Sequence, residues 1–264
     1  MTRIFLHSGF HKTGTSSIQA FLAKNRDILK PFVKILLLDE LPDVVRLSTR
    51  FSVSKHPLDL FDFQEAFCAF ASNLAHSSDA RPILISCEGL SGRSPGKKGI
   101  TTYKAATLIA QSMIGALEAE FSDSLDLSLI FTTREPNSWL KSVYKHNLHG
   151  YRITDTFQEF QAKYKDASDL NAIVKEIGTE NPGHKIVTIT LEEASLLELG
   201  PATAFLDLLE VPSSVRMDCV NPGIRNRGPD HNRELTLLEL NQSNLCDEDL
   251  TSKKRALQER KLSE

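Results

Sequence analysis

Short apolar runs alternate along this chain with longer segments of helical periodicity. The runs are nearly continuous in apolar residues and predict buried strands: Ile4–His7, Lys34–Leu38, Pro82–Cys87, Leu127–Thr133 and Lys185–Ile189. The intervening segments predict helices: Ser16–Leu29, Leu58–His76, Tyr103–Phe121, Asn137–Asn147 and Phe157–Ile177, the last in two pieces. Strands that alternate with helices pair in parallel, because each crossover helix returns the chain to the same edge of the sheet. We therefore expect a three-layer α/β fold, with about five mainly parallel strands and helices on both faces.

The length of the chain fits one large α/β domain or two small ones. The 264 residues are 41% hydrophobic, which is enough apolar material for a sizeable core. We predict a single domain over residues 1–245 and a polar C-terminal helix or tail over residues 246–264. The net charge of −3 argues against general nucleic-acid binding, so an anionic ligand must be held by a few well-placed groups. No sequence feature indicates an oligomeric state.

Cysteine usage and the N-terminal residues indicate a cytoplasmic protein. Cys68, Cys87, Cys219 and Cys246 are far apart and form no CxxC pair, so neither a zinc site nor a disulfide framework is expected. The start, MTRIFLHSGF, enters a strand pattern at once and has no apolar stretch followed by a cleavage site. No apolar run approaches the ~20 residues that span a bilayer, so stable membrane insertion is not expected.

The first predicted strand runs directly into a loop that is suited to an anion. Gly9 and Gly14 allow a tight turn and close approach of the backbone. The following helix presents free amides and the positive end of its dipole, and Lys12 adds a full charge. A capped helix is the alternative, but a cap needs only one or two such residues. The expected contacts are Gly9, His11, Lys12, Thr13, Gly14, Thr15, Ser16 and Ser17.

This loop is not a Walker A motif, GxxxxGK[ST], because Thr15 stands where the lysine would follow Gly14. The stretch His7–Gln19 (HSGFHKTGTSSIQ) instead resembles the 5'-phosphosulfate loop of sulfotransferases that use 3'-phosphoadenosine-5'-phosphosulfate (PAPS). It is most similar to the bacterial, carbohydrate-type branch, which writes the loop HxGxxKTGTTSIQ. The resemblance implies a P-loop-like nucleotide-binding fold and PAPS as the cofactor, without a metal.

A second anion site is expected after the fourth strand. Arg134 follows that strand, Pro136 suits the first position of a helix, and Ser142 lies two turns into it. Taken alone, Arg134 could equally be a salt-bridge partner. Sulfotransferases bind the 3'-phosphate with a strand-end Arg and a Ser eight residues later, which implies this role for Arg134 and Ser142. The resemblance runs from about residue 3 to about residue 245 and is diffuse elsewhere, as at Thr188–Pro212.

A late loop adds a weaker candidate contact. Residues Asn221–Asn232 (NPGIRNRGPDHN) read as irregular and contain Arg225 and Arg227. In the family a late loop closes over the nucleotide, which implies a phosphate contact for Arg225. Because this loop lacks the cytosolic enzymes' Arg-Lys-Gly motif, solvated surface charges are the alternative.

The resemblance implies in-line transfer of the sulfuryl group to a hydroxyl or amine of a carbohydrate or lipid-linked acceptor. Lys12 would stabilise charge on the leaving phosphate oxygen. Glu88 follows the third strand in the segment ILISCEGLS and would be the catalytic base, with His11 as the rival. Alternatively, Glu88 pairs with Lys97 or Lys98 and has no catalytic role. Residues 51–62 and 91–101 are expected to border the acceptor cleft.

Two other functions remain open from the sequence. ILISCE is an apolar strand that ends in an acid, as in a P-loop kinase or NTPase that uses ATP and magnesium. A non-catalytic module that binds adenosine 3',5'-bisphosphate would need the same loop, and only the presence of Lys12 and Glu88 argues against it.

Overall fold

A five-stranded parallel sheet forms the centre of the protein, as the alternation of runs predicts. The computed structural model describes residues 1–76, 79–97, 99–223 and 231–259. The strands are β1 (Thr2–His7), β2 (Lys34–Leu36), β3 (Ile83–Ser86), β4 (Leu125–Thr133) and β5 (Lys185–Thr190). Their order is β2-β3-β1-β4-β5, and every pair in the sheet is parallel. The α/β fold class and the parallel sheet are therefore confirmed.

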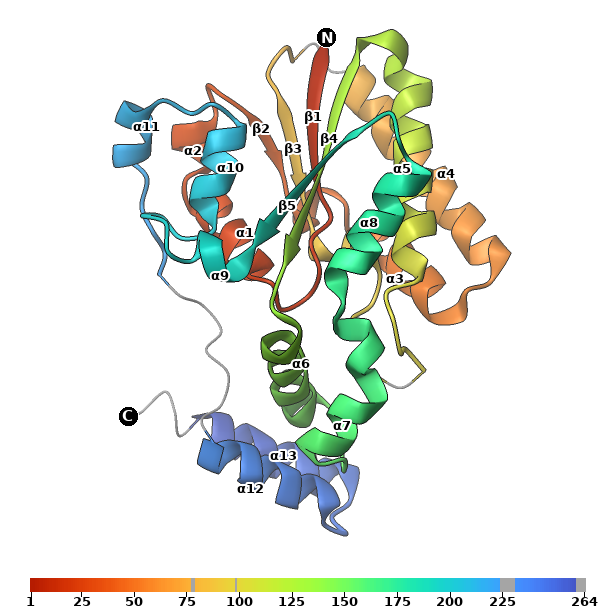
Figure 1. Ribbon diagram of the computed structural model, residues 1–264, viewed down its shortest axis with the longest axis vertical. Helices are drawn as coiled ribbons and strands as arrows, with labels where there is room; N and C mark the ends of the chain where they lie inside the picture. The colour runs from red at the N-terminus through yellow and green to blue at the C-terminus, as the bar shows by residue number, and fades with distance from the viewer. Residues whose placement is uncertain (77–78, 98, 224–230, 260–264) are drawn as a thin grey trace.

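Helices cover both faces of the sheet (Figure 1). The helices described are α1 (Thr15–Lys24), α2 (Arg26–Leu29), α3 (Pro42–Ser54), α4 (Pro57–Ala75), α5 (Ala105–Phe121), α6 (Pro136–Gly150), α7 (Phe157–Tyr164), α8 (Leu170–Glu180), α9 (Leu191–Ala194), α10 (Ala202–Leu208), α11 (Ser213–Met217), α12 (His231–Gln242) and α13 (Asp247–Glu259). None of these described helices combines the length and hydrophobicity that a bilayer crossing needs.

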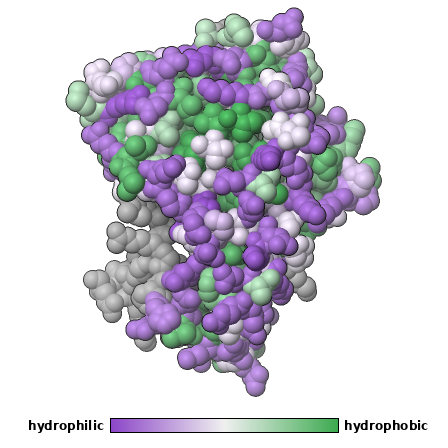
Figure 2. All heavy atoms as spheres, in the orientation of Figure 1, coloured by the Kyte–Doolittle hydropathy of each residue, from purple (hydrophilic) through white to green (hydrophobic). Residues whose placement is uncertain are grey.

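Alternation along the strands builds a separate core on each face. Ile4 and Leu6 of β1 pack with α3, α4 and α5, whereas Phe5 between them packs with α1 and α10. The other strands follow the same pattern, so nearly every strand residue is buried on one side or the other. The edge strand β5 is the exception, and Figure 2 shows apolar side chains, in green, gathered over it.

Two helices differ from the prediction. Ser16–Leu29 is not one helix: it breaks at Asn25, whose side chain bonds the Phe21 carbonyl as well as the amide and carbonyl of Val220. A side chain that competes for backbone groups in this way ends a helix. Helix α3 was not predicted, although Pro42 begins it at a favourable position. The two-piece interpretation of Phe157–Ile177 is confirmed by α7 and α8.

The carboxyl ends of the strands lie at the lower end of the view in Figure 1, where α6 begins. The connection from β1 runs toward β2 and β3, whereas the connection from β4 runs toward β5 on the other side. Ligands of open α/β sheets bind where the order of strands reverses in this way. In this fold that place lies between the loop after β1 and the residues after β4.

The C-terminal helices hold the far end of α6. The Lys254 ammonium of α13 donates hydrogen bonds to the carbonyls of Leu148 (2.7 Å) and Tyr151 (2.8 Å) at the carboxyl end of α6. Asn241 of α12 donates to the same Leu148 carbonyl at 3.1 Å. A cation and an amide at this position satisfy carbonyls that the helix leaves unpaired. Helix α6 is therefore fixed at its carboxyl end.

His7 connects the three central strands just before the loop. Its Nδ1 lies 2.8 Å from the Ser86 hydroxyl on β3, and its Nε2 lies 3.4 Å from the Thr132 hydroxyl on β4. The ring is fully buried, and burial lowers the pKa of His7 to about 3. The native protein therefore keeps this histidine neutral at pH values where an unfolded chain would protonate it.

We predict that the free energy of unfolding falls as the pH falls from about 6.5 toward 3, because only the unfolded chain then binds the His7 proton. Between pH 7 and pH 5, His7 contributes about 2 kcal/mol of this loss. Urea denaturation should show a smaller loss for His7→Asn than for the wild type. The exposed control His76→Asn should keep the full loss. Equal pH dependence of wild type and His7→Asn would contradict the prediction.

Candidate functional site

The loop after β1, residues 8–14, forms a turn with two left-handed residues. Lys12 has φ 69° and Gly14 has φ 92°. For a lysine this conformation is strained, and such strain persists only where the surroundings hold the backbone in place. At Gly14 a side chain would also collide with Leu191, since an added Cβ would lie 2.6 Å from its Cδ1. The loop is therefore held in a conformation that it would not adopt alone.

Threonine hydroxyls bind the first of three consecutive carbonyls in this loop. Thr13 and Thr15 both donate to the Phe10 carbonyl, at 2.6 and 3.2 Å. Thr13 also lies 2.6 Å from the Thr132 hydroxyl of β4. The side chains of Thr13 and Thr15 are both buried, and their hydroxyls bond within the protein. Of these two predicted ligand contacts, only the backbone amides are therefore left for a ligand.

Side chains from outside the loop bind the next two carbonyls. The Trp139 indole of α6 donates to the His11 carbonyl at 2.9 Å, and Arg134 donates to the Lys12 carbonyl at 3.2 Å. The His11 amide in turn donates to the Tyr103 hydroxyl at 3.1 Å. Because protein groups engage these three carbonyls, their oxygens are not available to face a ligand.

The start of α1 supplies free amides at the same place. The first backbone bonds of this helix run from Ser17 and Ile18 to the Gly14 carbonyl, at 3.0 and 3.2 Å. The amides of Thr15 and Ser16 therefore have no acceptor within the helix. Ser16 is exposed and Ser17 half-buried, so their hydroxyls are accessible, unlike those of the two threonines. Free amides at a helix N-terminus favour a phosphate or sulfate group.

Lys12 and Glu88 face each other across the site without forming an ion pair. Glu88 begins a turn of 3-10 helix, Glu88–Ser91, directly after β3. Burial raises the pKa of Glu88, although the charges of Lys12 and Lys97 partly lower it. Burial is the main cause that lowers the pKa of Lys12, and the charges of Lys97 and Arg134 lower it further. The negative charge of Glu88 acts in the opposite direction and raises the pKa of Lys12 in part. Among the described residues the Lys12 ammonium has no hydrogen-bonding or ion-pair partner, so it is free to meet a ligand.

Two histidines near Lys12, His11 and His146, are neutral at pH 7. Burial and then the charge of Lys97 lower the pKa of His11 to about 3, and its Nδ1 lies 3.1 Å from the Tyr103 hydroxyl. On α6, partial desolvation and the charge of Lys12 lower the pKa of His146 to about 4, although this residue is still exposed to solvent. The site thus keeps imidazoles uncharged beside several permanent cations.

Arg134 leaves β4 and lies beside the loop, as predicted. Its Nε donates to the Ser138 hydroxyl at 2.9 Å, and Glu192 lies 3.9 Å away. Ser142 lies one helical turn beyond Ser138 on the same side of α6, with His146 a further turn along. Arg134 and the serines therefore form a continuous stripe along α6 that begins at the loop. Of the predicted pair, Arg134 bonds Ser138, and Ser142 lies one helical turn farther along α6.

The predicted late loop, residues 221–232, lies only partly within the described residues. Arg225 and Arg227 fall in residues 224–230, outside the described part of the chain. In the predicted irregular loop 221–232, His231 and Asn232 already belong to α12, which corrects that boundary. Across the described ranges, no three His, Cys, Asp or Glu side chains gather where they could hold a metal ion.

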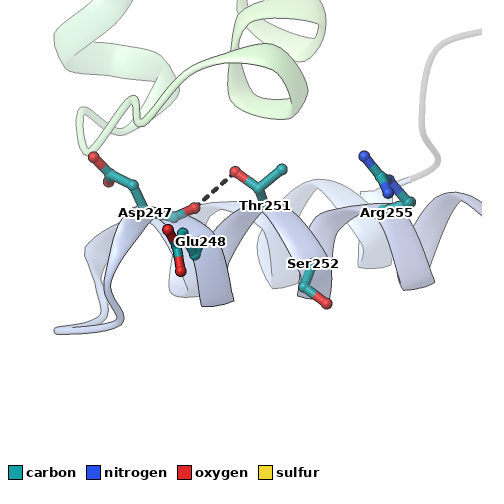
Figure 3. Close-up of a pocket in the computed structure, with 5 residues that line it drawn as sticks. All are labelled: Asp247, Glu248, Thr251, Ser252 and Arg255. Carbon is teal, nitrogen blue, oxygen red and sulfur yellow. Dashed lines mark hydrogen bonds between the residues drawn. The ribbon is translucent and has the colours of Figure 1, made fainter.

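A surface depression on α13 is separate from this site (Figure 3). Asp247, Glu248, Thr251, Ser252 and Arg255 line it, and all five come from one helix. The Thr251 hydroxyl donates to the Asp247 carbonyl at 2.7 Å, a bond within the helix. None of these residues contacts the loop after β1, so the depression does not contribute to the candidate site.

Local sequence patterns do not reveal the roles of four residues that shape the site. Tyr103, Thr132 and Trp139 hold the loop, and Lys97 provides charge next to Glu88. The sequence predicts for Lys97 only the alternative role of an ion-pair partner of Glu88. Long-range contacts of this kind leave no local pattern in the sequence. Tyr103 is 92 positions and Trp139 is 128 positions from His11, the residue that both contact.

Comparisons with known proteins bear on the fold. No family model matches the chain, and no curated protein matches it either. Among solved structures, a sulfotransferase from Alicyclobacillus acidocaldarius is similar, with a TM-score of 0.52 and 18% sequence identity. The match covers 93% of this chain and 97% of that one. The protein therefore has the fold of a sulfotransferase.

We predict that Gly9→Ala disrupts the loop. An added Cβ would collide with the His7 ring and lie 2.6 Å from the Thr132 hydroxyl, both of which are buried and hydrogen-bonded. The free energy of unfolding should fall by about 1–3 kcal/mol in chemical denaturation. Gly115→Ala is the control, because nothing lies within 4 Å of its added Cβ. A Gly9→Ala protein as stable as the wild type would show that the loop is not packed as described.

Proposed function

We propose that the protein is a sulfotransferase that moves the sulfuryl group of PAPS to a hydroxyl or amine of an acceptor. The observation that carries the proposal is the bond from Arg134 to the Lys12 carbonyl, which joins two anion-binding elements in one site. The helix start after Lys12 suits one anionic group, and the stripe from Arg134 along α6 suits another. A donor with a 5'-phosphosulfate and a 3'-phosphate has this pair of groups.

In the proposed complex each end of the donor has its own residues. The 5'-phosphosulfate accepts hydrogen bonds from the amides between Lys12 and Ser16 and from the accessible hydroxyls of Ser16 and Ser17. The 3'-phosphate lies against Arg134 and Ser142. A planar guanidinium fork matches a terminal phosphate well, and Ser138 keeps that fork oriented through its bond to Nε.

The proposed reaction is an in-line displacement at sulfur. The acceptor oxygen forms a bond to sulfur as the bond from sulfur to the 5'-phosphate oxygen breaks, and adenosine 3',5'-bisphosphate leaves. Glu88 takes the proton of the acceptor hydroxyl. Lys12, which has no partner among the described residues, stabilises the negative charge that develops on the leaving phosphate oxygen.

Electrostatics favour Glu88 over His11 as the base. A general base works best when its pKa is close to the working pH, and burial moves the pKa of Glu88 in that direction. The pKa of His11 is lowered to about 3, which leaves the imidazole a weak base, and its Nδ1 already contacts Tyr103. In this proposal His11 shapes the loop and Glu88 accepts the proton.

The donor is tested by calorimetry with adenosine 3',5'-bisphosphate in the absence of magnesium. Micromolar binding is expected, with a loss of about tenfold or more in Arg134→Ala and in Lys12→Ala, since each removes a charged contact. Arg46→Ala is the matched control, because Arg46 is exposed and pairs only with Asp43. Binding of ATP with magnesium in place of the bisphosphate would refute the proposal and favour a P-loop kinase.

The base is tested by the rate of bisphosphate release from PAPS with an acceptor that the wild type uses. Glu88→Gln should reduce the rate by about 10²–10⁴-fold while bisphosphate affinity is kept. The wild-type rate should fall on the acid side with a midpoint above pH 4.5, the ordinary value for a glutamate, because the pKa of Glu88 is raised. His11→Asn serves as the comparison and should retain more activity. A wild type that binds the bisphosphate but turns over no acceptor would indicate a non-catalytic module.

A further inference from the structure

We propose that the acceptor is an anion, and that Arg93 and Lys97 bind its negative group. Both residues belong to the loop between β3 and α5. The inference rests on the proposed function, because it assigns the acceptor side of the same site.

Contacts with three parts of the fold hold this loop against the site. The Ser91 hydroxyl donates to the Ser8 carbonyl, at the end of β1. The Arg93 amide donates to the Ser52 hydroxyl of α3 at 2.8 Å. The Asn147 side chain of α6 donates to the carbonyl of the residue before Lys97 at 2.9 Å. The backbone is therefore held at Arg93 and immediately before Lys97.

Arg93 and Lys97 are both half-buried. Neither Arg93 nor Lys97 forms an ion pair with any described residue. Both bond the Tyr151 hydroxyl, and the Lys97 ammonium lies 5.4 Å from the centre of that ring. Burial raises the pKa of Tyr151, but the hydrogen bonds and charges of the two cations together lower it. Half-buried cations held by a neutral phenol retain most of their capacity to bind an anion.

Lys97 lies close to both Lys12 and the proposed base, Glu88. Its charge acts on Lys12 and on Glu88, the proposed base. Arg134 also acts on Lys12, but it is not among the charges that act on Glu88. Lys12 is therefore close both to Arg134, which bonds its carbonyl, and to Lys97. A hydroxyl within reach of Glu88 would place its neighbouring groups next to Lys97.

The donor does not require Arg93 or Lys97. Its 5' group has the loop amides and Lys12, and its 3'-phosphate has Arg134 and the α6 serines. Arg93 and Lys97 have no role in this donor complex, and an anionic group on the acceptor would form hydrogen bonds and ion pairs with them. A carboxylate, phosphate or sulfate ester close to the reacting hydroxyl would do so, since each accepts hydrogen bonds from a guanidinium and an ammonium.

The test uses matched pairs of probes on the full chain saturated with adenosine 3',5'-bisphosphate. Glucuronate is paired with glucose, and glycerol 3-phosphate with glycerol, so that carboxylate and phosphate are separate arms. Calorimetry should show that at least one anion binds about tenfold more tightly than its neutral partner. Arg93→Gln and Lys97→Gln should each remove most of that preference. Lys175→Gln, an exposed lysine on α8, is the control and should keep it.

Bisphosphate affinity separates failure of this inference from failure of the proposed function. It should change by less than about threefold in Arg93→Gln and Lys97→Gln, and fall in Arg134→Ala. Loss of bisphosphate affinity in the two glutamine variants would assign the pair to the donor and overturn the inference. Equal affinity for charged and neutral probes, or no binding of either anion to the bisphosphate-loaded protein, would also overturn it. If the wild type does not bind the bisphosphate, the proposed function fails first.

Discussion

The site depends on the way three consecutive carbonyls of one loop are bound. Threonine hydroxyls hold the carbonyl of Phe10, Trp139 holds that of His11, and Arg134 holds that of Lys12. A loop of this length could equally turn its oxygens toward a ligand and repel an anion. Because protein donors engage the oxygens, the amides and the helix dipole are left to define the charge that the site accepts. The strained backbone of Lys12 is maintained by the same contacts.

Local charge, not net charge, sets the character of the site. The chain as a whole carries −3, yet four cations surround Glu88 or the loop: Lys12, Arg93, Lys97 and Arg134. The histidines between them are neutral because desolvation lowers the pKa values of His11 and His146, so they add no charge that would vary near pH 7. Such a cluster of fixed cations suits a reaction in which negative charge develops on a leaving phosphate oxygen.

Sequence patterns predicted the scaffold well where a signal was local. All five strands lie where apolar runs placed them, and α6 begins at Pro136 as its position after Arg134 indicated. Helix α3 was missed although Val44, Leu47 and Phe51 have helical spacing and are buried. The break after α1 could not be foreseen, since Asn25 gains its effect by bonding Val220, 195 residues away. Arg134 follows its strand as predicted, but its bond to Ser138 was not expected.

The sequence by itself determined the parallel sheet, the loop after β1 and the residues Lys12, Glu88 and Arg134 at the ends of strands. These follow from periodicity and from neighbours in the chain, which are fixed before the chain folds. Only the tertiary structure decided which hydroxyls remain accessible, that His11 is neutral, and that Lys97 lies close to Glu88. Burial and the contacts between distant residues control these properties, because desolvation and hydrogen bonding depend on what surrounds a group in space.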